Sequence, residues 1–279
     1  MKKAVRMLGL CALVALAFTA CKKNNTQKVS FTATMPQATT ESRTHVQGLN
    51  NDYFLVWDDG DQIKVFNQVG EDCDFELTTQ AGELATFTVE DADKISFIAD
   101  LESARYTAFY PNAVVDGNKV LLTIPEEQNY YPLHNFDNNT YPMYGVNNGT
   151  NFEFLSNAGF LYLRFQAPEG QVKQFDKVVV TANDPTDYLN GTFSYDKDAR
   201  TYQLIRATNV VTITSASKLS VLGDLLRDVT IILPEGALWS GFTVEVFDGE
   251  NCIFTKSAQP QANRIQAMHF TEMPSQVIE

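Results

Sequence analysis

Short runs of alternating apolar and polar residues recur along the chain. In the runs at 29–33, 62–66 and 85–89, apolar side chains return at every second position. Such alternation predicts a β-strand with one buried face, because successive side chains of a strand point to opposite sides. Further β-rich runs lie at 75–77, 106–110, 120–124, 160–165, 177–182, 192–195, 229–233 and 242–247. Many short strands separated by turn residues predict an all-β fold, either a sandwich or a barrel.

An irregular stretch divides these strands into two groups. Residues 125–149 are rich in Asn, Pro and Gly, a composition typical of loops. We therefore expect an N-terminal β-sandwich domain at 28–150 and a C-terminal β-sandwich domain at 151–279, both of ordinary domain size. Helical spacing of apolar residues occurs only at 218–228, where Gly223 weakens it.

The N-terminus has the pattern of an export signal. A basic segment at 1–6 precedes an apolar run at 7–17 that contains no charge. This run is too short to span a bilayer core of ~30 Å, so it indicates a signal peptide rather than a transmembrane helix. We assign residues 1–20 to the signal peptide.

The end of this signal is similar to the bacterial lipobox. Phe-Thr-Ala-Cys at 18–21 places small residues directly before a cysteine. In lipoproteins such a cysteine is acylated and becomes the mature N-terminus, which predicts lipidation of Cys21 and a polar tether at 21–27. The alternative is an ordinary signal peptide cleaved near Ala20.

The charge of the chain excludes some classes of partner. The chain has 21 Lys and Arg against 34 Asp and Glu, a formal net charge of −13, and its body has no basic cluster. Binding to nucleic acid requires clustered cations that replace counterions. We therefore expect no nucleic-acid partner and no electrostatic binding to an anionic bilayer surface.

Two cysteines remain after processing. Cys11 would leave with the signal peptide and Cys21 would be lipidated, leaving Cys73 and Cys252. Exported proteins can form disulfides. These two residues lie far apart in sequence and in different predicted domains, so two semi-buried thiols are favoured over a disulfide. Neither has a spacing typical of metal ligands.

Motifs for catalysis are weak. The three histidines, at 45, 134 and 269, stand apart, and neither a nucleophile elbow nor a Gly-rich phosphate loop is visible. Asp-Asp-Gly-Asp at 58–61 lacks the closing Glu of an EF-hand, which favours a turn over a calcium site. A pair of carboxylates for glycoside hydrolysis stays open, because nothing in the sequence selects a pair. We expect no enzyme activity, no catalytic residue, no metal and no cofactor.

Several aromatic residues lie in or near expected loops. Flat rings of this kind could form a glycan-binding surface, or they could cap the two cores and the seam between the domains. The residues concerned are Tyr130, Tyr131, Tyr141, Tyr144, Trp57 and Trp239. Trp57, just before the Gly60-Asp61 turn, is the expected core residue of this set.

The order of several motifs resembles a known family. The lipobox is followed by Ser-Arg-Thr at 42–44, Trp-x-x-Gly-Asp-x-Ile-x-Val at 57–65, Tyr-Pro-Met-Tyr at 141–144 and Phe-Thr-Val-Glu-Val-Phe-Asp-Gly at 242–249. This order resembles the fimbrillin family of Bacteroidales lipoproteins, which includes the stalk, anchor and tip subunits of type V pili. The resemblance implies two tandem transthyretin-like β-sandwich domains. It also implies an outer-membrane lipoprotein located at the cell surface or in a fimbrium.

The resemblance further implies a mode of assembly. In polymerising members an arginine-specific protease cuts after an Arg, which removes the first strand, and a terminal strand from a neighbouring subunit takes its place. The candidate cut is at Arg43, and the candidate displaced strand carries Val29, Phe31 and Ala33. The candidate donor strand at 264–270 carries Ile265, Ala267, Met268 and Phe270. The alternative is that Arg43 is an ordinary loop residue and that both strands pair within their own chain.

Two functional hypotheses follow. The first is a structural or accessory subunit of a surface fimbria, with other fimbrial subunits as partners and a role in adhesion. The second is a non-polymerising lipoprotein of the outer membrane that binds glycans or host protein through its aromatic loops.

Overall fold

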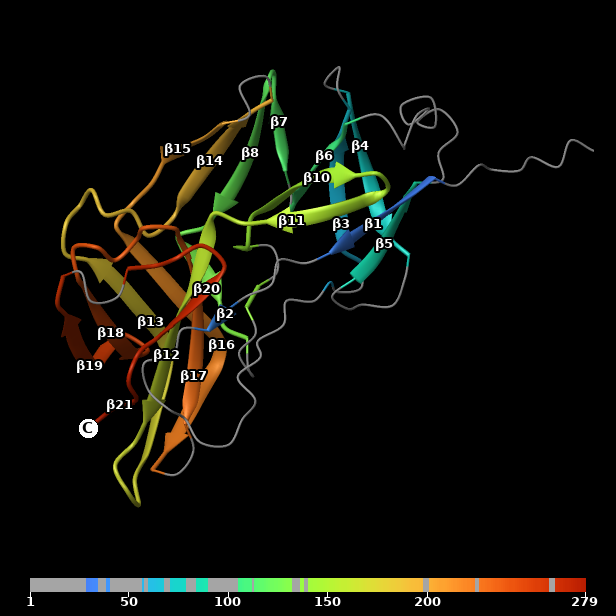
Figure 1. Cartoon of the computed structure of the whole chain (residues 1–279). Coiled ribbons are helices and arrows are strands. Elements are labelled where there is room, and N and C mark those ends of the chain that lie inside the picture. Colours follow the sequence, from blue (N-terminus) through green and yellow to red (C-terminus); the bar gives the residue numbers. More distant parts are fainter. Residues whose placement is uncertain are drawn as a thin grey trace, which may run out of the picture.

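The computed structural model describes most of the chain from residue 29 onward (Figure 1). The described residues are 29–34, 39–40, 57, 60–67, 71–78, 84–89, 105–111, 113–131, 136–137, 140–197, 201–223, 226–260 and 264–279. Their regular elements are β-strands in four sheets, which confirms the all-β prediction. In this part of the chain we find no helix with the length and apolar character needed to cross a membrane.

Strands between residues 29 and 155 close into a barrel, seen at the right of Figure 1. In order around the barrel they are β1 (Val29–Thr34), β11 (Asn151–Leu155), β10 (Met143–Asn148), β6 (Thr107–Tyr110), β3 (Gln62–Phe66), β4 (Asp72–Leu77) and β5 (Leu84–Val89). β1 completes the closure, because it pairs antiparallel with β5 and parallel with β11. These seven strands thus form one closed, hydrogen-bonded ring.

Two further sheets enclose the core of a sandwich. The first has the order β17 (Arg227–Pro234), β12 (Ala158–Gln166), β20 (His269–Glu272) and β2 (Thr39–Thr40), with β21 (Gln276–Val277) also paired to β12. The second has the order β19 (Asn251–Ala258), β18 (Phe242–Asp248), β13 (Val172–Ala182), β16 (Val210–Leu222) and β9 (Glu127–Asn129). Leu161 of β12 and Ile231 of β17 belong to the same buried cluster as Val180 of β13. This cluster is the core between the two sheets.

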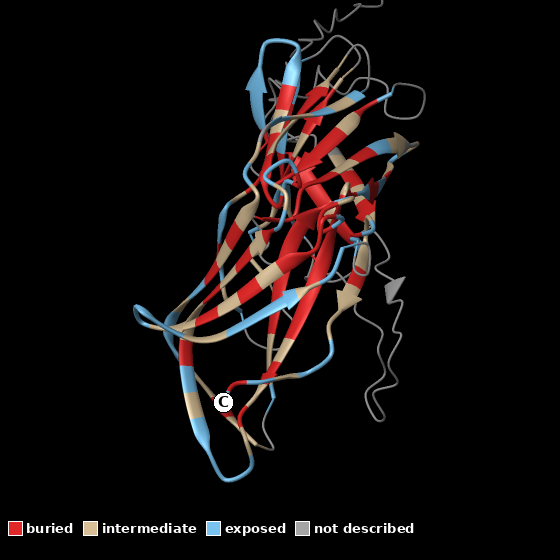
Figure 2. Cartoon of the chain, turned by 90° about the vertical axis from the view of Figure 1, so that its left-hand side faces the viewer, coloured by how far each residue is buried: buried red, intermediate tan, exposed pale blue. Residues whose placement is uncertain are grey.

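Strand β12 is buried on both faces and joins the barrel to the sandwich. Leu161 and Leu163 belong to the sandwich core, whereas Phe160 and Tyr162 belong to the barrel core. The sequence at 158–165 is therefore almost continuously apolar and does not alternate, as expected of a strand covered on both sides. Figure 2 shows these buried residues continuing through the centre of the molecule.

The fourth sheet packs on the outside of the barrel. Its order is β15 (Thr201–Arg206), β14 (Gly191–Asp196), β8 (Lys119–Ile124) and β7 (Val114–Asp116). Phe109 of the barrel wall packs against Tyr195 of β14, with ring centroids 5.0 Å apart. β14 from the second half of the chain thus pairs with β8 from the first half. The β10–β11 hairpin, which crosses residue 150, lies wholly in the barrel.

The segment with helical spacing at 218–228 is not a helix where the structure describes it. Residues 218–222 end β16, and residues 227–228 begin β17. Pairing with β13 and β12 places these residues in sheets, so tertiary context overrides the local periodicity.

Candidate functional site

The first strand fills the middle of the barrel core. The Phe31 ring is 0 % exposed and lies 4.7 Å from Phe152 of β11, 5.3 Å from Phe75 of β4 and 5.4 Å from Tyr106, measured between ring centroids. Ala33, the next inward residue, is also fully buried. Since these rings come from separate parts of the barrel, loss of β1 would open an apolar slot inside it.

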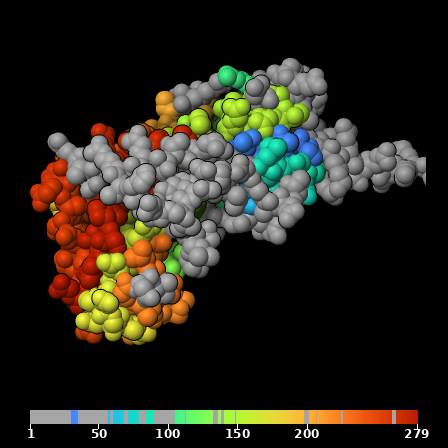
Figure 3. Space-filling view, turned by 60° about the horizontal axis from the view of Figure 1, so that its bottom comes forward, coloured from blue at the N-terminus to red at the C-terminus, as the bar shows by residue number. Residues whose placement is uncertain are grey.

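Both edges of β1 are hydrogen-bonded to neighbouring strands. Six residue pairs join β1 to β5, and three join it to β11. On the outer face, the Ser30 and Thr88 hydroxyls lie 2.9 Å apart, and the Thr32 hydroxyl donates to Oδ1 of Asn151 at 2.9 Å. Figure 3 shows β1 (blue) at the surface between β5 (teal) and the yellow-green β10–β11 hairpin. Removal of β1 would therefore expose two rows of unpaired backbone groups that another strand could satisfy.

Trp57 closes over the end of β1. Its side chain is fully buried and its Nε1 donates to the carbonyl of Ala33 at 3.3 Å. The ring packs edge to face on Phe87, Tyr110 and Phe154, at centroid distances of 4.9–5.2 Å. This confirms the prediction that Trp57 is a core residue.

A second short strand follows β1 on the same segment. β2 pairs in parallel with β20, with Thr39 opposite His269 and Thr40 opposite Phe270. The segment therefore contributes one strand to the barrel and another to the edge of a sandwich sheet. Arg43, the expected cut, lies just after β2 and outside the described residues, as does Cys21. A cut after Arg43 would release β1 and β2 together.

The C-terminal segment lies in its own chain. The expected strand at 264–270 begins only at His269, and residues 264–268 form a loop and turn. Ile265 and Phe270 are buried, whereas Ala267 and Met268 are half-buried. Phe270 stacks on Phe160 of β12 with ring centroids 4.2 Å apart. Donation of this segment to another subunit would require it to leave β12.

A glycine of β12 makes room for this C-terminal turn. A Cβ added to Gly159 would lie 2.1 Å from the carbonyl oxygen of Gln266 and 2.9 Å from Cγ2 of Ile265. The backbone of the C-terminal turn can approach the backbone of β12 this closely only because residue 159 has no side chain.

We expect Gly159→Ala to displace the C-terminal turn and to lower the free energy of unfolding by about 1–3 kcal/mol, as overpacking does. Urea denaturation of the variant measures this loss. Gly149→Ala is the matched control for adding a methyl group, since no atom lies within 4 Å of a Cβ there, although its φ of 62° adds some strain. Equal losses in the two variants would contradict the close packing at Gly159.

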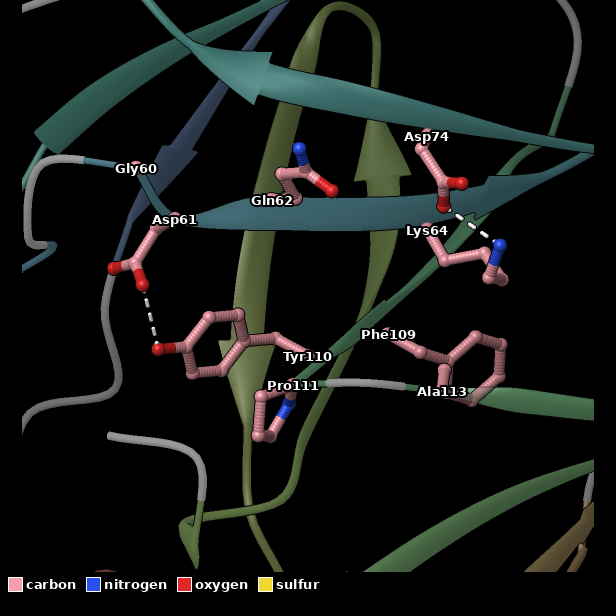
Figure 4. A pocket seen from close by; sticks show the side chains of 9 residues that line it. All are labelled: Gly60, Asp61, Gln62, Lys64, Asp74, Phe109, Tyr110, Pro111 and Ala113. Atoms are coloured by element: carbon pink, nitrogen blue, oxygen red, sulfur yellow. Dashed lines mark hydrogen bonds and ion pairs between the residues drawn. The ribbon is translucent and has the colours of Figure 1, made fainter. Parts of the chain in front are cut away.

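A pocket of about 260 Å³ lies outside the barrel wall, between β3 and the chain that follows β6 (Figure 4). The Tyr110 hydroxyl donates to Oδ1 of Asp61 at 2.8 Å. Nζ of Lys64 lies 2.6 Å from Asp74 and 3.4 Å from Asp72. Burial opposes the charge on Lys64, but the hydrogen bond and charge of Asp74 outweigh it and raise the pKa of Lys64 above its ordinary value. The pocket's charges are thus paired within the chain, and its lining contains no nucleophile beside a base.

The remaining candidates for chemistry are scattered. Among the described residues, no group of three or more His, Cys, Asp or Glu side chains could hold a metal ion. Cys73 is buried and Cys252 exposed, and neither is in a disulfide. Nδ1 of His269 lies 2.6 Å from the carbonyl of Ala267. His45, His134, Asp58 and Asp59 lie outside the described residues.

The aromatic residues singled out from the sequence do not form one surface. Tyr141 is buried, and Tyr130 and Tyr144 are half-buried. Tyr131 and Trp239 are exposed, at 42 % and 44 %. Tyr188, which is 41 % exposed in the β13–β14 connection, was not predicted from the sequence as an exposed aromatic residue. Its place directly after Asp-Pro-Thr-Asp, a turn composition, is the signal that could have drawn attention to it.

Comparison with known proteins shows that the chain shares its fold with a solved structure. No protein-family model and no curated protein matches the chain. Among solved structures, it is similar to a candidate cell adhesion protein from Bacteroides ovatus ATCC 8483, at 12 % identity and TM-score 0.56, over 91 % of this chain and 92 % of that one. A weaker likeness is to a candidate cell adhesion protein from Bacteroides fragilis NCTC 9343, at 10 % identity and TM-score 0.47, over 88 % of this chain and 91 % of that one. Another is to the C-terminally truncated tip fimbrial protein Mfa3 from Porphyromonas gingivalis, at 11 % identity and TM-score 0.28, over 75 % of this chain and 81 % of that one. The first likeness spans nearly all of both chains and shows a shared fold.

Proposed function

We propose that this protein is a structural or accessory subunit of a surface fimbria that supports adhesion. It assembles when proteolysis removes its first strand and a strand from another subunit enters the vacated place. The observation that carries this proposal is the position of β1, which fills the barrel core and has a partner strand on each side. The likeness to a candidate cell adhesion protein from Bacteroides ovatus supports the same role.

The position of β1 makes it separable from the rest of the barrel. β2 and the candidate cut at Arg43 follow it, and the next described barrel strand, β3, begins at Gln62. One cut after Arg43 therefore separates β1 from the other six strands. These would form an open sheet with β5 at one edge and β11 at the other, and apolar side chains would face the gap between them.

The same cut would separate the protein from its anchor. We propose that Cys21 is lipidated and holds the uncut chain at the outer membrane, with the first 20 residues removed as a signal peptide. Cys21 precedes β1, so anchor and first strand lie on one fragment. The cut breaks the covalent link, and release from the lipid and opening of the groove then happen together, when this fragment leaves the barrel. On this proposal the two parts of the fold are tandem transthyretin-like units, and the protein is structural rather than enzymatic.

An arginine-specific protease tests the proposal. We expect limited digestion of the mature protein to cut after Arg43, as read by intact mass, and to yield oligomers on size-exclusion chromatography. Arg43→Lys keeps the positive charge but removes the cleavage site, and this matched variant should stay uncut there and monomeric. A clean cut at Arg43 that leaves a stable monomer would contradict the proposal.

A second candidate function is favoured by the exposed side chains of Trp239 and Tyr188. On this alternative the uncut protein stays at the outer-membrane surface and binds a glycan or a host protein. Resistance at Arg43 combined with glycan binding would favour it.

A further inference from the structure

Two exposed aromatic side chains lie on adjacent loops at one end of the sandwich. Tyr188 belongs to the connection between β13 and β14, and Trp239 to the connection between β17 and β18. They are 41 % and 44 % exposed. Large aromatic side chains are usually mostly buried, so two such rings on neighbouring loops call for an explanation.

A buried carboxylate holds the two loops together. Asp187 is 1 % exposed; its Oδ1 accepts from the backbone N–H of Leu238 at 3.0 Å, and its Oδ2 accepts from the N–H of Ser240 at 2.9 Å. The Ser240 hydroxyl donates to Oδ2 as well, at 2.6 Å. Tyr188 directly follows Asp187, and Trp239 lies between the two residues that Asp187 binds. The clamp therefore fixes the backbone positions of both aromatic residues relative to each other.

The backbone turns so that Trp239 faces solvent. Leu238 is fully buried in the sandwich core and Ser240 is 8 % exposed. Leu238 has a φ of 67°, a left-handed conformation that costs a non-glycine residue ~1–2 kcal/mol. This strained turn places Leu238 in the core and leaves the Trp239 ring on the outside. Strain of this kind is concentrated at functional positions.

The loop that carries Tyr188 also carries hydrogen-bonding groups. Asp184 lies at the surface of the same loop and accepts from the hydroxyl and backbone N–H of Thr186, at 2.7 and 2.8 Å. These hydrogen bonds lower the pKa of Asp184 below its ordinary value, so it is charged at neutral pH. Nδ2 of Asn183 donates to the carbonyl of Ser240 at 3.2 Å, which leaves Oδ1 as a further acceptor in this loop.

We propose that Tyr188 and Trp239 form a binding surface for a neutral polysaccharide. A sugar ring has an apolar C–H face that can lie on an aromatic ring and a rim of hydroxyls that can donate to carboxylate and amide oxygens. Two exposed aromatic residues on clamped loops that also carry such acceptors match that chemistry, and their fixed backbone limits the entropy lost on binding.

Other occupants fit this surface less well. A stable protein interface buries ~800 Å² on each partner and has an apolar centre, whereas this surface is a pair of rings among polar residues. An acidic glycan would meet Asp184 and a chain with a net charge of −13. A neutral glycan meets neither obstacle.

The two tryptophans of the chain make the test direct. Trp57 is fully buried, so Trp239 is the exposed one. We expect titration of the uncut protein with dextran, yeast mannan and xyloglucan to show that at least one of them changes tryptophan fluorescence and shields it from acrylamide. Trp239→Ala and Tyr188→Ala should each weaken binding of that polysaccharide, measured by calorimetry, about tenfold or more.

Tyr131→Ala is the matched control, because Tyr131 is equally exposed but belongs to a different part of the chain. It should bind as the unchanged protein does. The proposal is overturned if no neutral polysaccharide binds, if heparin or polygalacturonate alone binds, or if Trp239→Ala binds normally. The uncut monomer is used throughout, so neither result depends on fimbrial assembly.

Discussion

Phe31→Ala is expected to lower the free energy of unfolding by about 3–5 kcal/mol, the usual range for truncating a fully buried Phe. The Phe31 ring contacts aromatic rings from three other parts of the barrel, and the small side chain would leave a cavity that these rings cannot close by moving together. The loss is a large fraction of the stability of an ordinary domain.

Urea denaturation followed by fluorescence measures this effect. Trp57 donates to the Ala33 carbonyl of β1 and therefore reports on the barrel; a Trp239→Phe background removes the second signal. Leu84→Ala is the control on the adjacent strand, since Leu84 pairs with Thr34 but is 61 % exposed, and it should change stability by no more than ~0.5 kcal/mol. A loss below ~1 kcal/mol for Phe31→Ala would show that β1 does not fill the core.

Locking β1 to β5 should abolish assembly. Ser30 and Thr88 lie directly opposite each other in the antiparallel pair, with hydroxyls 2.9 Å apart. Residues directly opposite each other in an antiparallel pair have Cβ atoms ~4.5–5.5 Å apart, close to the ~3.5–4.5 Å that a disulfide needs. We expect a chain with Ser30→Cys and Thr88→Cys, in a Cys252→Ser background, to keep its first strand after cleavage and to form no oligomers until a reductant is added.

The matched control for the lock is the single variant Ser30→Cys in the same background, which should assemble with and without reductant. Oligomers that form from the oxidised double variant would mean that subunits join without vacating the β1 position. In that case the surface by which they join lies elsewhere.

The hydrophobic pattern of the sequence predicted most strands but not how seven of them close into a barrel. Ile63 and Val65 of β3 and Phe87 of β5 are buried as their alternation predicts. Closure of the barrel depends on the parallel pairing of Thr32 with Asn151, residues with no local pattern that connects them. Pairing of β14 with β8 is equally distant in sequence. Such pairings depend on tertiary packing, which hydrophobic periodicity does not specify.

The turn in the C-terminal segment and the exposure of Tyr188 were likewise not predictable from the local sequence. Alternation at 264–270 predicts a strand, but Gly159 admits a turn at Gln266 and delays the strand until His269. The exposure of Tyr188 depends on hydrogen bonds between Asp187 and a loop more than 50 residues away. In both cases the deciding contact joins distant residues.

Native mass spectrometry of the cleaved protein tests the central claim most directly, because it weighs the first-strand fragment and the assembled subunits together. We predict that residues 21–43 stay bound to the cut monomer and that one such fragment is lost for each subunit that joins another. Oligomers that retain every fragment, or that form equally well from uncut Arg43→Lys protein, would contradict replacement of β1 as the basis of assembly.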